Sequence, residues 1–87
     1  MKLIRNGTCG SLQSNDCLVK VSKNSSNENK IIIESIVKEE FGEEIQEVIV
    51  NKLNELDIES CIVEIEDKGA LNFTISARVE TAIRRAI

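Results

Sequence analysis

Apolar and polar residues alternate along the first part of the chain, and this period of two is typical of half-buried β-strands. Residues 7–21 predict a β-hairpin whose loop is Ser14-Asn15, because Ser and Asn both suit tight turns and Asn tolerates a positive φ angle. In this register Leu12 faces Cys17, and both side chains lie on the buried side of the hairpin.

Two glycines lie on the first strand of this predicted hairpin. The expected register pairs Gly10 with Val19 across the two strands. Glycine within a strand often marks a bulge or a place where another backbone approaches closely. We therefore expect a bulge or a close backbone approach at Gly7 or Gly10.

Two further short strands and one loop follow from the same pattern. Residues 22–30 are wholly polar and predict a loop. Ile31–Glu34 is rich in β-branched residues and predicts a third strand, and the alternating stretch Cys61–Glu66 predicts a fourth.

The period changes to that of a helix between the third and fourth strands. Apolar residues recur there at steps of three and four, which predicts a helix over about 36–56 with Ser35 as its N-cap. Gly42 lies inside this pattern and indicates close packing or a slight bend. The apolar stripe comprises Val37, Phe41, Ile45, Val48, Ile49, Leu53 and Leu56, and the opposite face carries Glu39, Glu40, Glu43, Glu44, Glu47 and Glu55.

The last segment fits two patterns. We favour a helix over about 70–86, capped by Asn72 or Asp67, because its final residues follow the helical period. A β-hairpin that turns at Gly69 remains the alternative. With the helix, the element order is βββαβα, which predicts an α+β fold: one small domain over residues 1–87, with a mainly antiparallel sheet and two helices packed on one face.

Composition narrows the chemistry that this chain can perform. The 87 residues include no histidine, so a Ser-His or Cys-His nucleophile pair cannot form within the chain. The formal net charge of −4 argues against nucleic acid as a partner. No apolar run approaches the length of a membrane span, and the first residues lack the apolar core of a secretory signal, so we expect a cytoplasmic protein without a membrane partner.

The three cysteines and the arginines near the end of the chain have simple interpretations. Cys9, Cys17 and Cys61 show no metal-ligand spacing, so we expect no metal site and interpret them as small buried residues in a reducing compartment. Arg78, Arg84 and Arg85 suit a helix C-terminus, where cations oppose the helix dipole.

Ser14 is the candidate functional residue. A serine in a tight turn is most often only a turn former. Ser14 nevertheless lies at the exposed tip of the predicted hairpin, with no base beside it, and Asp16 follows two positions later on the water-facing side. An exposed hydroxyl without a base is suited to being modified by another enzyme and not to catalysis of its own.

Two segments resemble the acyl carrier protein of citrate lyase, its gamma subunit. They are GSLQSND, which begins at Gly10, and EDKGALNFTISARVETAIRRA, which runs from Glu66 to Ala86. The resemblance extends along the chain and includes Phe41-Gly42-Glu43. The tip in that family usually reads GTLESGD, so this chain differs at Ser11, Gln13 and Asn15.

The resemblance implies a function for Ser14. It identifies Ser14 as the serine that carries 2'-(5''-phosphoribosyl)-3'-dephospho-CoA through a phosphodiester. In the family the thiol of this group is acetylated, the alpha subunit exchanges acetyl for citryl, and the beta subunit cleaves the citryl thioester to oxaloacetate. The carrier itself has no catalytic residues, and a prosthetic-group transferase and an acetate ligase act on it transiently.

Two other functions stay open at this stage. The carrier of malonate decarboxylase shares the prosthetic group and a similar architecture, although the closing segment here is more similar to that of citrate lyase. A non-carrier module that uses its acidic helix to bind a basic partner is also consistent with the glutamates on the helix.

Overall fold

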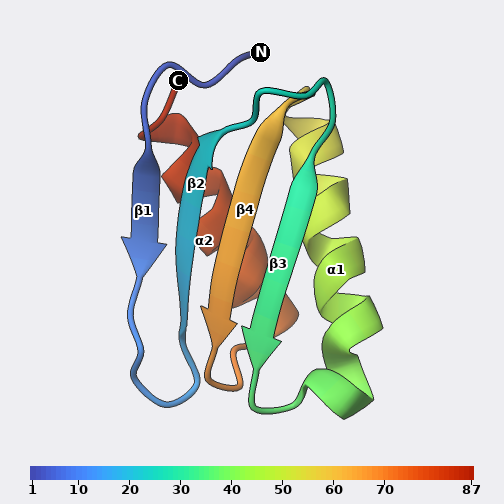
Figure 1. The fold of residues 1–87 in the computed structure, drawn as a ribbon. Helices are drawn as coiled ribbons and strands as arrows, with labels where there is room; N and C mark the ends of the chain where they lie inside the picture. Colours follow the sequence, from blue (N-terminus) through green and yellow to red (C-terminus); the bar gives the residue numbers. More distant parts are fainter.

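The computed structural model describes residues 1–87 and contains four strands and two helices (Figure 1). Their order is βββαβα, as the sequence predicts. The elements are β1 Gly7–Gly10, β2 Cys17–Lys23, β3 Lys30–Ser35, α1 Lys38–Glu55, β4 Cys61–Asp67 and α2 Asn72–Arg84.

The strands form one mixed sheet in the order β1-β2-β4-β3. β1 with β2 and β2 with β4 are antiparallel, whereas β3 with β4 is parallel, since α1 carries the chain back between them. Both helices lie on the same face of this sheet (Figure 1). The predicted fold class, a mainly antiparallel α+β sandwich, is confirmed.

The core lies between the sheet and the two helices, and alternation on the central strands builds it. Along β4, and along β2 up to Val21, every second residue points toward the helices and is buried, which explains the period of two in the sequence. The buried apolar residues of these elements are Cys17, Val19, Val21, Cys61, Val63 and Ile65 on the strands, and Ile45, Ile49, Leu53, Ile75, Val79, Ala82 and Ile83 on the helices.

The predicted register of the hairpin is wrong by one residue. Cys9, and not Gly10, pairs with Val19, and the connection between β1 and β2 is the six-residue loop 11–16 instead of a two-residue turn. Leu12 therefore lies in the loop with 51% of its surface exposed, not on the buried face. The first strand has a single apolar side chain, that of Cys9, so its hydrophobic pattern is too weak to specify a register.

The predicted cap of α1 is also wrong in detail. The helix begins at Lys38, and Val37 occupies the N-cap position without a side-chain hydrogen bond. Ser35 is the last residue of β3; its hydroxyl accepts a hydrogen bond from the Val37 N–H at 3.1 Å and donates one to Asp67 at 2.8 Å. Ser35 thus stabilises the turn that precedes the helix and ties it to the end of β4.

The segment after β4 is helical, so the alternative hairpin through Gly69 is wrong. Neither predicted cap acts as one, because Leu71 occupies the N-cap position without a side-chain hydrogen bond. Asn72 is the first helical residue, and the Asp67 carboxylate accepts the N–H of Ala70 at 2.9 Å in the turn before the helix. Neither α1 nor α2 combines the length and apolar character that crossing a membrane requires.

Candidate functional site

Ser14 lies in an exposed turn of the loop between β1 and β2. This loop is at the end of the molecule opposite to the two chain termini (Figure 1). The Asp16 N–H donates to the Gln13 carbonyl at 3.1 Å, so Ser14 and Asn15 are the two central residues of this turn. Asn15 has a φ of 66°, which a type II turn requires at its third position and which Asn adopts more readily than most residues.

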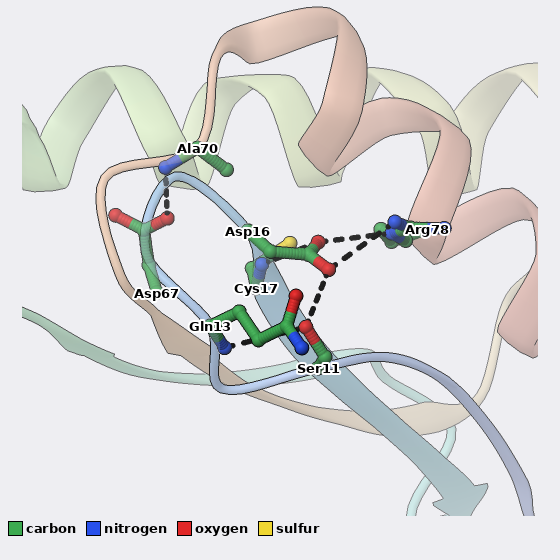
Figure 2. Close-up of polar contacts among 7 residues, drawn as sticks. All are labelled: Ser11, Gln13, Asp16, Cys17, Asp67, Ala70 and Arg78. Carbon is green, nitrogen blue, oxygen red and sulfur yellow. Dashed lines mark hydrogen bonds and ion pairs between the residues drawn. The ribbon is translucent and has the colours of Figure 1, made fainter.

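The Asp16 carboxylate fixes the shape of the loop through hydrogen bonds to both sides of it. It accepts hydrogen bonds from the Ser11 hydroxyl at 2.7 Å and from the Cys17 N–H at 2.7 Å. The Arg78 guanidinium reaches it from α2 with two bonds, Nε to Oδ1 at 3.0 Å and Nη2 to Oδ2 at 3.2 Å (Figure 2). A bidentate pair of this kind fixes orientation as well as distance.

These contacts hold Asp16 in its ionised form. The hydrogen bond from Ser11, followed by those from Arg78 and from the Cys17 N–H, lowers the pKa of the Asp16 carboxyl to about 2. The Asp16 side chain is 17% exposed, whereas that of Arg78 is 39% exposed, so the carboxylate is the more shielded partner of the ion pair. We call Ser11, Asp16 and Arg78 together the Asp16 clamp.

A neighbouring turn supports the loop from the side. The Asn15 N–H donates to the Lys68 carbonyl at 2.8 Å, and the Lys68 N–H donates to the Asp16 carbonyl at 2.9 Å. Lys68 follows β4, where the buried Asp67 binds both the Ala70 N–H and the Ser35 hydroxyl. The Ser14 turn is therefore attached to β4 and α2 through backbone and side chain alike, and has little freedom to move.

The hydroxyl of Ser14 itself takes no part in the contacts that hold the loop. The prediction that Ser14 is exposed at the bend between the first two strands is confirmed. The Asp16 carboxylate, two residues along the chain, makes no hydrogen bond with this hydroxyl and is engaged by Ser11, Cys17 and Arg78. The arrangement presents an exposed hydroxyl on a turn that is held by hydrogen bonds on both sides.

Sequence reasoning missed the Asp16 clamp. It placed Asp16 on the water-facing side of a regular hairpin, and it assigned Arg78 to a helix C-terminus. Arg78 instead lies in the middle of α2 and pairs with Asp16 across 62 residues of sequence. No local sequence pattern reveals such a pair. The one available hint is that Arg78 stands among small and apolar residues, namely Ala77, Val79 and Ala82.

All three cysteines are free and buried. Burial raises the pKa of Cys17 to about 12 and that of Cys61 to about 11. At pH 8 a thiol with a pKa near 11 is ionised to only about one part in a thousand, and the thiolate is the reactive form. In the folded chain Cys17 and Cys61 therefore have little thiol reactivity.

We expect a chromogenic disulfide reagent at pH 8 to react with the unmodified native chain at least ~100-fold more slowly than with an exposed cysteine. In denaturant, all three thiols should react at once. The matched control is Ser25→Cys, which places a thiol in the exposed loop between β2 and β3 and should add one fast equivalent. A fast equivalent in the native wild-type chain would contradict the burial described here.

Comparison with known proteins gives the class to which this fold and site belong. A family model described as the malonate decarboxylase delta subunit (MdcD), an acyl carrier protein model, matches residues 4–86. The fold also matches a chain of the crystal structure of a Pseudomonas malonate decarboxylase hetero-tetramer in complex with malonate, with a TM-score of 0.77 and 16% sequence identity, over 97% of this chain and 90% of that chain. The class is that of the α+β acyl carrier proteins.

Curated relatives identify the family within this class. The citrate lyase acyl carrier protein of Treponema denticola is 45% identical over 86 residues, which cover 99% of this chain and 97% of the relative. Those of Clostridium perfringens and Salmonella typhimurium are 42% and 36% identical, over 99% of this chain and 85% and 89% of the relatives. The chain belongs to the citrate lyase acyl carrier protein family, as the sequence motifs predict.

Proposed function

We propose that this chain is the acyl carrier subunit of a citrate lyase and that Ser14 is the attachment point of 2'-(5''-phosphoribosyl)-3'-dephospho-CoA. The observation that carries the proposal is an exposed hydroxyl, without a hydrogen bond to the rest of the chain, on a turn held by the Asp16 clamp. Family membership and the match of GSLQSND to the family's tip motif support the assignment.

The chain takes part in its own modification only through this hydroxyl. The Ser14 Oγ attacks the phosphorus of an activated nucleotide donor, a new P–O bond forms, and the bond between phosphorus and the donor's leaving group breaks. The hydroxyl proton goes to a base of the modifying enzyme, because this chain has no histidine and Asp16 is occupied by its own partners.

The attached group supplies a terminal thiol that carries acetyl or citryl as a thioester while citrate is cleaved to acetate and oxaloacetate. The chain supplies a fixed anchor, which keeps that thiol at an effective concentration on the order of millimolar near the alpha and beta subunits. Cys17 and Cys61 do not compete as acyl acceptors, because burial raises the pKa of both thiols and their thiolate forms are scarce. On this proposal the subunit is non-catalytic, and its transferase and acetate ligase bind it transiently.

Intact mass measurement tests the proposal directly. Wild-type chain that is co-expressed with the modifying transferase should gain the mass of one prosthetic group, and peptide mapping should place it on Ser14. Ser14→Ala should show no gain while it keeps the stability of the wild type within about 0.5 kcal/mol, because the side chain is exposed. Ser25→Ala, an exposed serine in another loop, should be modified like the wild type. Modification of Ser14→Ala would overturn the assignment.

A malonate decarboxylase carrier is the second candidate, favoured by the family model and by the Pseudomonas structure. The same serine would then carry the same type of group, so intact mass does not separate the two. The acyl-transferase subunit that co-purifies with the chain decides between them. A third possibility, a plain acidic interaction module, requires that Ser14 is never modified.

A further inference from the structure

A groove of about 450 Å³ opens beside the Ser14 turn, between the first half of α1 and the start of α2. Gly69 connects the two features, since it lines the groove and a side chain at this position would lie 3.7 Å from the Asn15 Oδ1. We call it the Phe41–Phe73 groove. Its apolar lining consists of Val37, Phe41, Ile45, Ala70, Leu71 and Phe73.

The apolar rim of this groove is unusually exposed. Phe41, Leu71 and Phe73 have 49%, 62% and 72% of their surfaces in contact with solvent. They include both aromatic residues of the chain. The sequence pattern predicted Phe41 as part of the core-facing stripe, yet the core is complete without it. Large exposed apolar side chains gathered at a groove are typical of a binding surface.

Acidic residues border the groove on the α1 side. Glu44 lines it and accepts a hydrogen bond from the Asn72 side chain at 2.9 Å. Glu40 and Glu47 lie four and three residues from it on the same side of the helix, Glu43 directly precedes it, and all three are exposed. A partner that fits this surface therefore presents an apolar protrusion with basic residues around it.

We infer that the Phe41–Phe73 groove is the docking surface for the enzyme that attaches the nucleotide-containing group to Ser14. The inference depends on the proposed function. An enzyme that forms a bond to the Ser14 Oγ must approach within contact distance of the turn and of the groove next to it. Enzymes that act on the far thiol of the long arm have no such need.

The chemistry of the donor supports this choice of partner. The donor of a phosphoribosyl group carries several phosphates, so the enzyme that binds it has a basic active site. The glutamates of α1 complement such a surface. They also repel the phosphates of the attached arm, so the groove is unsuited to binding that arm. A basic enzyme with an apolar contact surface therefore matches both the apolar rim of the groove and the negative charge of the glutamates beside it.

Binding is measured best on Ser14→Ala, which cannot be modified, with the purified transferase and calorimetry. In this background, Leu71→Ser with Phe73→Ser should weaken binding at least ~10-fold, because exposed aromatic and aliphatic anchors dominate such contacts. The matched control is Ile4→Ser with Ile32→Ser, which removes two side chains that are 60% and 42% exposed, outside the groove. The control should bind within ~2-fold of the parent, and circular dichroism should show both variants folded.

Charge reversal gives an independent readout. Glu40→Lys with Glu43→Lys should weaken binding at low salt, and the loss should shrink as ionic strength rises. Glu34→Lys with Glu64→Lys makes the same change in net charge on the open face of the sheet, away from the helices, and should have little effect. If the two double variants weaken binding equally, the charge effect is nonspecific. This result would overturn the inference that the glutamates beside the groove contact the enzyme.

The outcomes separate this inference from the proposed function. If Ser14 is modified and the groove variants bind and react like the wild type, the docking surface is wrong and the carrier assignment stands. If wild-type chain is never modified, both fail. Sedimentation provides one more outcome: a wild-type dimer that Leu71→Ser converts to a monomer assigns the groove to a second copy and overturns the inference.

Discussion

Asp16→Ala is expected to lower the free energy of unfolding by about 2–3 kcal/mol, the largest effect of any single side chain in the loop. The change removes an acceptor that Ser11, Cys17 and Arg78 share and leaves the guanidinium of Arg78 without its carboxylate. Urea unfolding followed by far-ultraviolet circular dichroism measures it, because the chain has no tryptophan or tyrosine for fluorescence.

A double-mutant cycle provides the control for this result. Arg78→Met keeps most of the aliphatic stem of the side chain and removes the charge. If the two residues act as a pair, Asp16→Ala combined with Arg78→Met should cost less than the sum of the single changes by about 1 kcal/mol or more. Strict additivity would show that the ion pair contributes nothing to stability.

The same clamp predicts a pH dependence of stability. The pKa of Asp16 is about 2 in the folded chain against an ordinary value of 3.8, so the unfolded chain binds the proton first as pH falls. The ionised carboxylate therefore stabilises the fold fully above pH ~5, and this contribution is lost as pH falls toward ~2. The stability difference between wild type and Asp16→Asn should shrink over this range by on the order of 1–2 kcal/mol.

If Ser14 is the attachment point that we propose, the Asp16 clamp also positions it for modification. Asp16→Ala leaves the hydroxyl in place but frees the turn, so we expect a lower rate of modification at saturating transferase. Asp16→Asn, which keeps an acceptor for the Cys17 N–H, should recover part of that rate. If Asp16 contributes only to stability, the Asp16→Ala variant should be modified at the wild-type rate when it is assayed well below its unfolding temperature.

Patterns within one element were sufficient to predict most of the fold. Period-two alternation identified β2 and β4, and steps of three and four identified α1, because each of these elements has one face on the core. The short strand β1 has Cys9 as its only apolar side chain, so nothing in its sequence opposed a shift of one residue. The parallel pairing of β3 with β4 depends on a crossover and also lies outside local patterns.

The candidate site divides in the same way. The exposure of Ser14 could be predicted, since turn-forming residues surround it. The support beneath it could not, because Arg78 and Lys68 reach the loop from distant parts of the chain. The groove was missed for a different reason. Phe41 has the spacing of the apolar stripe on α1, yet half of its surface is exposed because α2, which begins at Asn72, does not cover it. The spacing of residues in one helix cannot show where a neighbouring helix begins.

Gly10→Ala is expected to destabilise the fold by about 3–5 kcal/mol. Gly10 has a φ of 107°, which costs a residue with a side chain roughly 1–3 kcal/mol. A Cβ at this position would also lie 1.8 Å from the Cys17 carbonyl oxygen, so the backbone of β1 or β2 must move where the chain enters the loop. Thermal and urea unfolding measure the loss, and modification of Ser14 should slow with it because the loop that contains the Ser14 turn begins directly after Gly10.

Gly42→Ala is the matched control, with the opposite sign. Gly42 lies in α1, where alanine favours the helix by about 1 kcal/mol relative to glycine. The new Cβ would meet only the flexible Lys38 side chain, at 3.3 Å from its Cγ. Gly42 thus packs closely against no other element, contrary to one expectation from the sequence, and the variant should be more stable than the wild type by up to ~1 kcal/mol. A larger loss of stability in Gly42→Ala than in Gly10→Ala would contradict this account. The close approach of Gly10 to the Cys17 carbonyl would then not determine the shape of the loop that contains Ser14.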